Sequence, residues 1–497
     1  MKPPKNLLLC VLLMPSLFIT ISQAQRPPPA TIDQSFISFL ISTKGLEFVK
    51  DLLITEAVSS LTPLDIPPIQ NTRKIPFLGN VNFLLSNITI YQINVSESYI
   101  KPGDSGVAII VSGATANLSM NWYYSYSTAW LLPIEISDKG NASVEVEGMQ
   151  VGLTIGFGNQ EGILKLSLLE CGCFVEDINI KLDGGASWLY QGFVDAFVGE
   201  IDSAVENAVT KKLKEGLLKL DSLLQSLPNE IPIDDMAYLN VSFVNDPVLS
   251  SSSIGFEVNG LFTPRERMPI SDFNHKDLLT FSCDDPSKML GISVDEAVFR
   301  SASSLYFNAG YLQWIVDKIP DQSLLNTAGW RFIIPQLYKK YPNDDMNLNI
   351  SFASAPAVRI LRDSIDAMVY ADLIIDVLED HEVIPVACIL LEIQATGSVK
   401  ILSNYLVGSV KLDDFTMSLK WSKIGNLRMR LIQPVVWTLI QTVFLPFANT
   451  RLGKGFPLPI IRGFTLENAG ISFSNSSIVV CSDVAYEKSY DLALQIL

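Results

Sequence analysis

Apolar and polar residues alternate along most of this chain, and several longer segments instead show helical periodicity. Over residues 45–61 the apolar positions recur every three or four residues, which places them on one side of a helix and predicts an amphipathic helix. The period is two from Ile88 and again from Val144, with a slip of phase at residues 91–92 and at Gly148. A slip within a continuous alternation marks a β-bulge, so both segments are predicted to be long, bent antiparallel strands.

Turn-forming residues separate these segments. Hairpins are expected at residues 101–104 (Lys-Pro-Gly-Asp), 137–140 (Ser-Asp-Lys-Gly) and 158–162 (Gly-Asn-Gln-Glu-Gly). Gly184-Gly185 then ends the strands, and Ser187 is expected to cap a long helix with Val194, Phe197 and Ile201 on its apolar face. That helix runs into three lysines at 211, 212 and 214, which we interpret as complementing its dipole rather than forming an anion site.

The second half of the chain repeats this order of strands followed by a long helix. Residues 348–352 alternate, a later alternation slips at Asp413-Asp414, and an amphipathic segment follows at 424–450. Polar residues interrupt the apolar run 431–447, so we expect a buried amphipathic helix there rather than a membrane span. Proline and serine residues between positions 228 and 264 indicate a connector, and the repeated order indicates a tandem duplication.

The amino terminus has the pattern of a signal peptide. Lys2 and Lys5 precede an apolar run at 7–21, and small residues at 22 and 24 favour cleavage after Ala24, which predicts a secreted, extracellular protein. A secreted protein can be glycosylated at its Asn-X-Ser/Thr sequons, because glycans are added to exposed asparagines in the lumen of the secretory pathway. The seven sequons, several of which should be glycosylated, begin at Asn87, Asn94, Asn117, Asn141, Asn240, Asn349 and Asn475.

Cysteine usage leaves the disulfide pattern open. Once Cys10 is removed with the signal peptide, five cysteines remain at positions 171, 173, 283, 388 and 481, so at least one is unpaired or pairs between chains. Cys171 and Cys173 would share one face of a strand, and we expect one to be disulfide-bonded and the other to be packed. A metal site is not expected, because the chain has only His275 and His381 and no second cysteine pair nearby.

The net charge restricts the partners. Without Lys2 and Lys5 the mature chain has 34 basic and 52 acidic residues, a formal charge of −18, which disfavours nucleic acid. With 48% hydrophobic residues over 473 mature positions, the chain is too long for one core and should form two large domains.

Several motifs together resemble one family. Residues 290–293 (Leu-Gly-Ile-Ser) and 307–310 (Phe-Asn-Ala-Gly) resemble the start of the second domain of the family that includes the bactericidal permeability-increasing and lipopolysaccharide-binding proteins. Residues 396–399, 407–410 and especially 454–459 (Lys-Gly-Phe-Pro-Leu-Pro) keep the family's order and rough spacing. Residues 41–46 (Ile-Ser-Thr-Lys-Gly-Leu) look like the signature that opens the first domain, and residues 66–67 match the exit from its first helix.

The resemblance implies an α+β boomerang of two similar domains. Each would be a long-stranded, twisted antiparallel barrel packed on a long helix, with an apolar pocket for acyl chains, and a central sheet would join the two. The expected boundaries are a signal peptide at 1–24, an amino-terminal barrel at 25–245, a connector and central sheet at 246–270, a carboxy-terminal barrel at 271–488 and a tail at 489–497. Family members bind lipopolysaccharide or phospholipid, and relatives move sterol esters or phospholipids, so no cofactor is implied.

This sequence departs from the family pattern in three respects. Leu40 stands where the family usually has arginine, and residues 187–227 lack the helix cysteine of the family's strand-to-helix disulfide. Where the antibacterial relatives have a basic first domain, residues 25–240 have 13 basic and 25 acidic side chains, a net charge of −12. Lipid A phosphates would find little attraction there, although a local cluster including Arg73 and Lys74 could form a small site.

Affinity could instead come from acyl chains buried against the apolar helix faces, although the same side chains would also serve as ordinary core. The candidate lipid-binding residues are Leu46, Val49, Leu53, Val194, Phe197 and Ile201. Three functions follow: a lipopolysaccharide-sensing binder in innate defence, a phospholipid or sterol transfer protein, and a lipid hydrolase. The expected partners are lipopolysaccharide or phospholipid and a membrane or lipid-aggregate surface, while any protein receptor is undetermined.

We do not expect an enzyme. Residues 103–106 (Gly-Asp-Ser-Gly) look like the nucleophile motif of trypsin-like proteases, but Val107 replaces the next glycine and no histidine precedes His275. Gly156-Phe157-Gly158 is expected to be a turn, with no helix after it to cradle phosphate. His381-Glu382 lacks the second histidine of a zinc protease, and no carboxylate pair marks an acid-base site.

Overall fold

A computed structural model describes residues 34–75, 79–128, 134–184, 197–265, 281–283, 285–318 and 322–487 of the chain. The residues from Ser35 onward form one unit. The predicted signal peptide, the proposed helix cap Ser187, Val194, His275 and the tail lie outside the described residues.

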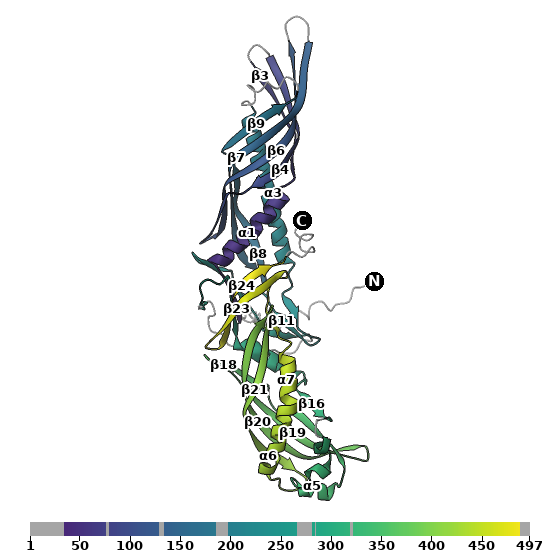
Figure 1. Cartoon of the computed structure of the whole chain (residues 1–497). Helices are drawn as coiled ribbons and strands as arrows, with labels where there is room; N and C mark the ends of the chain where they lie inside the picture. The colour runs from purple at the N-terminus through teal and green to yellow at the C-terminus, as the bar shows by residue number, and fades with distance from the viewer. Residues whose placement is uncertain are drawn as a thin grey trace, which may run out of the picture. The chain divides into compact units, whose positions relative to one another are not determined.

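Eight strands of the first half form one antiparallel sheet (Figure 1). Its longest members are β6 (Gly106–Thr128) and β7 (Ile134–Gln160), which pair with each other in the middle of the sheet. The remaining strands are β2 (Leu64–Ile66), β3 (Ile69–Ile75), β4 (Gly79–Asn94), β5 (Glu97–Gly103), β8 (Ile163–Phe174) and β9 (Asp177–Asp183).

The predicted bulges are confirmed in this sheet. The register between β4 and β6 shifts between Ile90 and Gln92, and Gly148 of β7 lies with a φ of +64° where the β6–β7 register shifts. Two of the predicted hairpins are also confirmed. β5 and β6 join at residues 103–106, and β7 and β8 join through Glu161 and Gly162, both of which have positive φ.

Two other predicted turns are wrong. Residues 137–140 and 156–158 both lie within β7, which continues through them. Pairing with one long neighbour, β6 along residues 137–140 and β8 along residues 156–158, overrides the local turn preference of glycine and aspartate, because each residue in the strand gains ladder hydrogen bonds. Close packing also explains why position 140 is a glycine, because a Cβ there would lie 2.7 Å from the ring of Trp122.

Two helices accompany the first sheet, α1 (Thr43–Ser60) and α3 (Val198–Gln225). α1 matches the predicted helix and begins at Ser42, whose hydroxyl accepts from the Gly45 amide at 3.3 Å. α3 buries its predicted apolar face, with Ile201, Val205 and Val209 in the core. Our interpretation of its lysines is wrong. The helix continues to Gln225, so Lys211, Lys212 and Lys214 lie in its middle rather than in its last turn.

A central six-stranded sheet mixes strands from both halves. β1 (Ile37–Ser42) pairs on one side with β13 (Ser253–Val258) and on the other with β15 (Leu290–Asp295). The order continues from β15 to β24 (Ser477–Tyr486) and β23 (Phe464–Ser474), with β12 (Val248–Leu249) at the other edge. A separate small sheet contains β10 (Glu230–Pro232), β11 (Ala237–Asn240) and β14 (Phe262–Pro264).

The second half builds a seven-stranded antiparallel sheet on the same plan. The predicted slip at residues 413–414 is confirmed as a register shift between β20 and β21. The strands are β16 (Gln313–Val316), β17 (Asp345–Phe352), β18 (Ala357–Ile360), β19 (Ile365–Glu379), β20 (Glu382–Leu402), β21 (Tyr405–Ser422) and β22 (Phe456–Pro457). Short helices accompany them: α4 (Glu296–Asn308), η2 (Gln322–Leu325), η3 (Thr327–Trp330) and α5 (Pro335–Lys340).

A long helix covers this second sheet, in three consecutive parts: α6 (Met429–Leu439), the π-helical η4 (Ile440–Phe444) and α7 (Leu445–Leu452) (Figure 1). Met429–Leu452 is long and apolar enough to cross a membrane, with a mean hydropathy of 1.5, and it is the one such helix among the described residues. Its inner face, including Ile432, Val436 and Leu439, belongs to the core of the domain. The expected burial therefore holds for one face, whereas Leu431, Trp437 and Phe447 are exposed.

The fold is thus α+β, as expected, with two similar domains of twisted antiparallel strands on a long helix and a central sheet between them. The residues expected as a connector, 246–270, supply β12, β13 and β14. The exact domain boundaries stay a prediction.

Candidate lipid-binding surface

Apolar side chains of α1, α3 and the first sheet meet in a cluster that is only partly covered. Ile109, Ile155, Leu166 and Leu217 are buried at its centre. Around them pack the half-buried side chains of Leu53, Ile100, Leu153, Phe157, Leu220 and Leu224, which we call the inner apolar surface. Half-buried apolar residues beside a core are the kind of lining that an acyl chain would contact.

The inner apolar surface continues onto the central sheet. Ile100 and Phe157 also pack against a second cluster, formed by Leu46, Val107 and Ile254. The ring of Phe157 meets that of Phe256 on β13 edge-on, with centroids 6.4 Å apart. The apolar lining therefore extends from α3 across β7 to the strands that join the two domains.

The predicted lipid-binding residues fall into separate environments. Leu53 lies on the inner apolar surface, and Leu46, which is 4% exposed, belongs to the second cluster with Val107 and Ile254. Val49 on the same helix is half-buried. Phe197 and Ile201 pack in the main core of the first domain, where the Phe197 ring lies 4.2 Å from that of Phe83 on β4. Leu46 and Leu53 thus lie in adjoining clusters that share Ile100 and Phe157, whereas Phe197 and Ile201 lie in another cluster.

Sequence reasoning missed Ile100, Phe157 and the end of α3. Phe157 was expected in a turn because glycines flank it, yet it continues the alternation of Val151, Leu153 and Ile155. That period of two was the signal that would have placed it on the inner face. Leu220 and Leu224 were missed because the helix was expected to end near its lysines.

A buried lysine lies on α1 near this surface. Lys50 is 5% exposed, and its Nζ lies 2.6 Å from Glu47 Oε2 and 3.2 Å from Asp51 Oδ1 and donates to the Ser98 carbonyl at 3.3 Å. Burial by itself lowers the pKa of Lys50, but the hydrogen bonds and charges of Glu47 and Asp51 outweigh it and raise that pKa. Its charge is therefore compensated within the protein and is not free for a lipid phosphate.

Cys171 and Cys173 share the inner face of β8, as expected, but the expectation that one is disulfide-bonded is wrong. The disulfide joins Cys283 to Cys481, and both thiols of β8 are free. Cys171 Sγ faces α3, 4.0 Å from the Thr210 carbonyl oxygen. Burial raises the pKa of Cys173 to about 12, with Glu206 adding to the effect, so this thiol is protonated at neutral pH.

Two of the motifs weighed for catalysis lie in hairpin turns. Residues 103–106 join β5 to β6, and His381 forms the β19–β20 turn together with Asp380, with φ angles of +70° and +46°. In the part of the chain that the structure describes, no group of three or more His, Cys, Asp or Glu side chains could hold a metal ion.

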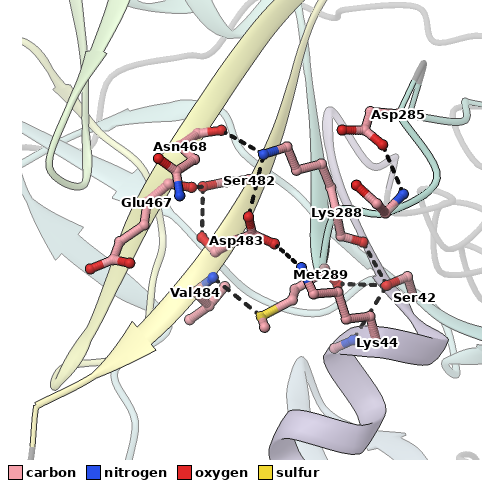
Figure 2. Close-up of polar contacts among 12 residues, drawn as sticks. Ser42, Lys44, Asp285, Lys288, Met289, Glu467, Asn468, Ser482, Asp483 and Val484 are labelled. Carbon is pink, nitrogen blue, oxygen red and sulfur yellow. Dashed lines mark hydrogen bonds and ion pairs between the residues drawn. The ribbon is translucent and has the colours of Figure 1, made fainter.

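The start of α1 is held by polar contacts with distant segments (Figure 2). Ser42 Oγ donates to the Lys288 carbonyl at 2.6 Å, so the residue that caps α1 also binds the segment before β15. Lys44 Nζ donates to Asp483 Oδ1 at 2.8 Å, and Lys288 Nζ lies 3.3 Å from Asp483 Oδ2. At Gly45 a Cβ would lie 2.4 Å from the Met289 carbonyl oxygen, so only glycine fits there. The signature at residues 41–46 thus fixes α1, and with it Leu46 and Leu53, against the central sheet.

The sequons lie at different depths. Asn87, Asn94, Asn141 and Asn475 are exposed, whereas Asn117, Asn240 and Asn349 are half-buried. Asn117 Nδ2 donates to Gln92 Oε1 at 3.3 Å, and Asn240 Oδ1 accepts from the Ser242 amide at 2.9 Å.

Two domains of long antiparallel strands on long helices, sharing a central sheet and an apolar lining beneath α1, define the class of two-domain lipid-binding proteins. The family models agree with this class: that of the LBP / BPI / CETP amino-terminal domain matches residues 45–227, and that of the carboxy-terminal domain matches residues 232–486. The chain belongs to the LBP / BPI / CETP family.

Individual relatives match along nearly the whole length. A BPI/LBP family protein of Arabidopsis thaliana is 59% identical over 476 residues, covering 96% of each chain. The bactericidal permeability-increasing protein of Sebastes schlegelii is 26% identical, covering 90% of this chain and 94% of its own. The crystal structure of lipopolysaccharide binding protein superimposes with a TM-score of 0.61 at 20% identity, covering 91% of this chain and 99% of that chain, which shows the shared fold.

Proposed function

We propose that this protein is a secreted lipid-binding protein that binds bacterial lipopolysaccharide, through the acyl chains of lipid A, and phospholipid, and that it acts in innate immune defence. Membership in the family supports lipid binding. Two similar relatives bear the names lipopolysaccharide-binding protein and bactericidal permeability-increasing protein, which supports the choice of lipopolysaccharide.

The observation that carries the proposal is the inner apolar surface beneath α1. Its half-buried side chains come from four elements and continue onto the central sheet, so an extended chain could contact them along its length. Burying methylene groups stabilises a complex by about 0.8 kcal/mol each, so one chain of about 14 carbons contributes roughly 11 kcal/mol before the cost of ordering it. Apolar contact can therefore supply affinity that the acidic first domain does not supply through phosphate.

A second function, phospholipid or sterol transfer without specificity for lipopolysaccharide, is favoured by charge. Residues 25–240 have a net charge of −12, which repels the phosphates of lipid A. The cation on α1 that lies nearest the core, Lys50, is already paired with Glu47 and Asp51. Transfer of phospholipid or sterol needs an apolar site but no cationic side chains that bind lipid phosphates. We propose no enzymatic activity in either case.

Native mass spectrometry of the secreted protein with lipid extraction tests the proposal. Bound phospholipid, followed by tight and salt-sensitive binding of added lipopolysaccharide, is the result expected for the defence role. Bound phospholipid or sterol, no binding of lipopolysaccharide and movement of labelled lipid between vesicles would establish the transfer function instead. Release of fatty acid from the bound lipid would contradict both and indicate a hydrolase. The same spectra report glycans at the sequons and cleavage after Ala24.

A pair of variants tests the position of the lipid. Leu53→Gln places an amide on the inner apolar surface and should reduce the amount of lipid that co-purifies with the protein. Leu218→Gln on α3 is the matched control, because Leu218 is exposed and its replacement should leave the lipid content unchanged. Equal lipid content in the two variants would place the acyl chains elsewhere.

A further inference from the structure

The outer face of the α6–η4–α7 helix carries an unusual combination of side chains. Trp437 and Phe447 are 50% and 48% exposed, and Leu431 is 44% exposed. Arg428 and Arg430 are exposed at one end of the helix and Arg451 at the other. We call these six residues the α6–α7 face.

The charge of this region is opposite to that of the protein. From residue 415 to residue 466 the chain has seven lysines and arginines and no aspartate or glutamate, whereas the whole chain has a net charge of −16. Lys420 is paired with Asp372 at 2.8 Å. Within the described residues, Arg428, Arg430 and Arg451 form no ion pair with a carboxylate, so their charges stay available to a partner.

In α6 and again in α7, a cation and an exposed aromatic side chain lie on the same side of the helix. Arg430 and Trp437 are seven residues apart in α6, which is two turns. In α7 the Arg451 guanidinium lies over the Phe447 ring, 5.4 Å from its centroid. Phe447 in turn stacks on Trp314 of β16, with ring centroids 5.7 Å apart, so Trp314 holds the Phe447 ring in place at this end of the face.

The opposite side of the helix decides how it can meet a membrane. Ile432, Val436, Leu439 and Ile440 are fully buried in the core of the second domain. A helix that spanned a bilayer would have to withdraw these residues from that core, and each large side chain withdrawn would leave a destabilising cavity behind. Lying in the plane of the interface requires no such change, because the exposed side already carries tryptophan, leucine and arginine.

We propose that the α6–α7 face docks the protein on an anionic phospholipid bilayer, with Trp437 and Leu431 in the headgroup region and the arginines on lipid phosphates. This rests on the proposed lipid binding and locates the expected contact with a lipid surface in the second domain, whereas the inner apolar surface belongs to the first. Cations near an anionic membrane surface strengthen binding about fivefold each, and tryptophan favours the bilayer interface.

Sedimentation of the full-length protein with vesicles tests the proposal. The protein should bind vesicles of phosphatidylcholine mixed with phosphatidylglycerol and bind phosphatidylcholine alone much more weakly. The variant with Arg428, Arg430, Arg451 and the exposed Lys454 just after α7 all changed to glutamine should bind the mixed vesicles several hundredfold more weakly, from about fivefold for each of the four charges. Tryptophan emission should shift to shorter wavelength on binding, and the Trp437→Phe variant should lose most of this shift.

The matched control removes four exposed lysines of the first domain, Lys101, Lys139, Lys165 and Lys211, and should bind as the natural protein does. Loss of binding in this control with binding retained in the arginine variant would move the contact to the first domain and overturn the proposal. So would an absence of binding to either kind of vesicle, which would leave an acidic protein as the partner of this face. Native mass spectrometry of the same variants reports bound lipid separately, so failure of docking is distinguishable from failure of lipid binding.

Discussion

Lys44 and Asp483 form an ion pair of 2.8 Å across a sequence separation of 439 residues. Lys44 lies in the first turn of α1 and Asp483 lies on β24, so the pair connects the helix of the first domain to the last strand of the central sheet (Figure 2). Lys288 binds the other oxygen of the same carboxylate, at 3.3 Å. Asp483 therefore joins three segments that are distant in sequence.

The variant Asp483→Asn should lower the free energy of unfolding by about 1 kcal/mol at neutral pH, since each partly exposed pair contributes up to about 1 kcal/mol. Lys44 and then Lys288 hold the pKa of Asp483 below its ordinary value of 3.8. The stabilisation is therefore complete above that value and is lost as the pH falls through the lower pKa of the folded protein. Urea unfolding at neutral pH and near pH 3 measures both effects. Asp104→Asn in the β5–β6 turn is the control. If Asp483→Asn lowered the free energy of unfolding equally at both pH values, the role of the charge would be contradicted.

The variant Gly45→Ala should destabilise the protein by about 1 to 3 kcal/mol or prevent folding. The new Cβ would lie 2.4 Å from the Met289 carbonyl oxygen and 2.9 Å from Ile41 Cγ2, and that carbonyl is held in place because it accepts from the Ser42 amide at 3.0 Å. Gly216→Ala in α3 meets no atom within 4 Å and should instead stabilise the helix by about 1 kcal/mol. Thermal unfolding compares the two; equal melting temperatures would show that the space at Gly45 is larger than the structure indicates.

The Cys283–Cys481 disulfide should contribute about 2 to 4 kcal/mol, because it closes a loop of 198 residues in the unfolded chain. The variant Cys283→Ser should therefore unfold at lower urea concentration, while Cys171→Ser should unfold much as the natural protein does. Thiol titration of the denatured, signal-cleaved protein should find three free thiols, those of Cys171, Cys173 and Cys388. One free thiol would mean that a second disulfide forms.

The two thiols of β8 should react at different rates. Burial raises the pKa of Cys173 to about 12. Burial also raises the pKa of Cys171, but the charge of Lys214 opposes this rise. Because the thiolate is the reactive form, alkylation near pH 8 should modify Cys171 before Cys173. Peptide mass spectrometry over a time course measures the order, and Lys214→Gln should slow the reaction at Cys171. Faster modification of Cys173 would show that β8 separates from α3.

Much of the fold followed from local sequence patterns. The bulges at residues 91–92, at Gly148 and at Asp413 were predicted from slips in a period of two, because each extra residue shifts the side chains to the other face of the strand. The helix at residues 43–60 followed, to within two residues, from the apolar spacing of residues 45–61. The turns predicted within β7 failed, because pairing of those residues with β6 or with β8 outweighs what glycine and aspartate prefer alone.

The candidate site was less predictable. Leu46 and Leu53 were chosen from one helical face, but Ile100 and Phe157, which complete the lining, come from strands whose contact with that helix is not a local property. Phe197 and Ile201 satisfied the same helical pattern and yet belong to a different core cluster.

By itself, the sequence determined the periods and bulges of the elements, the family and the acidic charge, since these depend on residues close together in the chain. Only the tertiary structure decided which cysteines pair, that Lys50 is buried beside Glu47, and that Asp483 binds Lys44 and Lys288. It also decided that one side of the Met429–Leu452 helix is core and the other is exposed with unpaired arginines. These relationships depend on contacts between segments up to hundreds of residues apart, and a periodic pattern carries no information about which distant segment a face will meet.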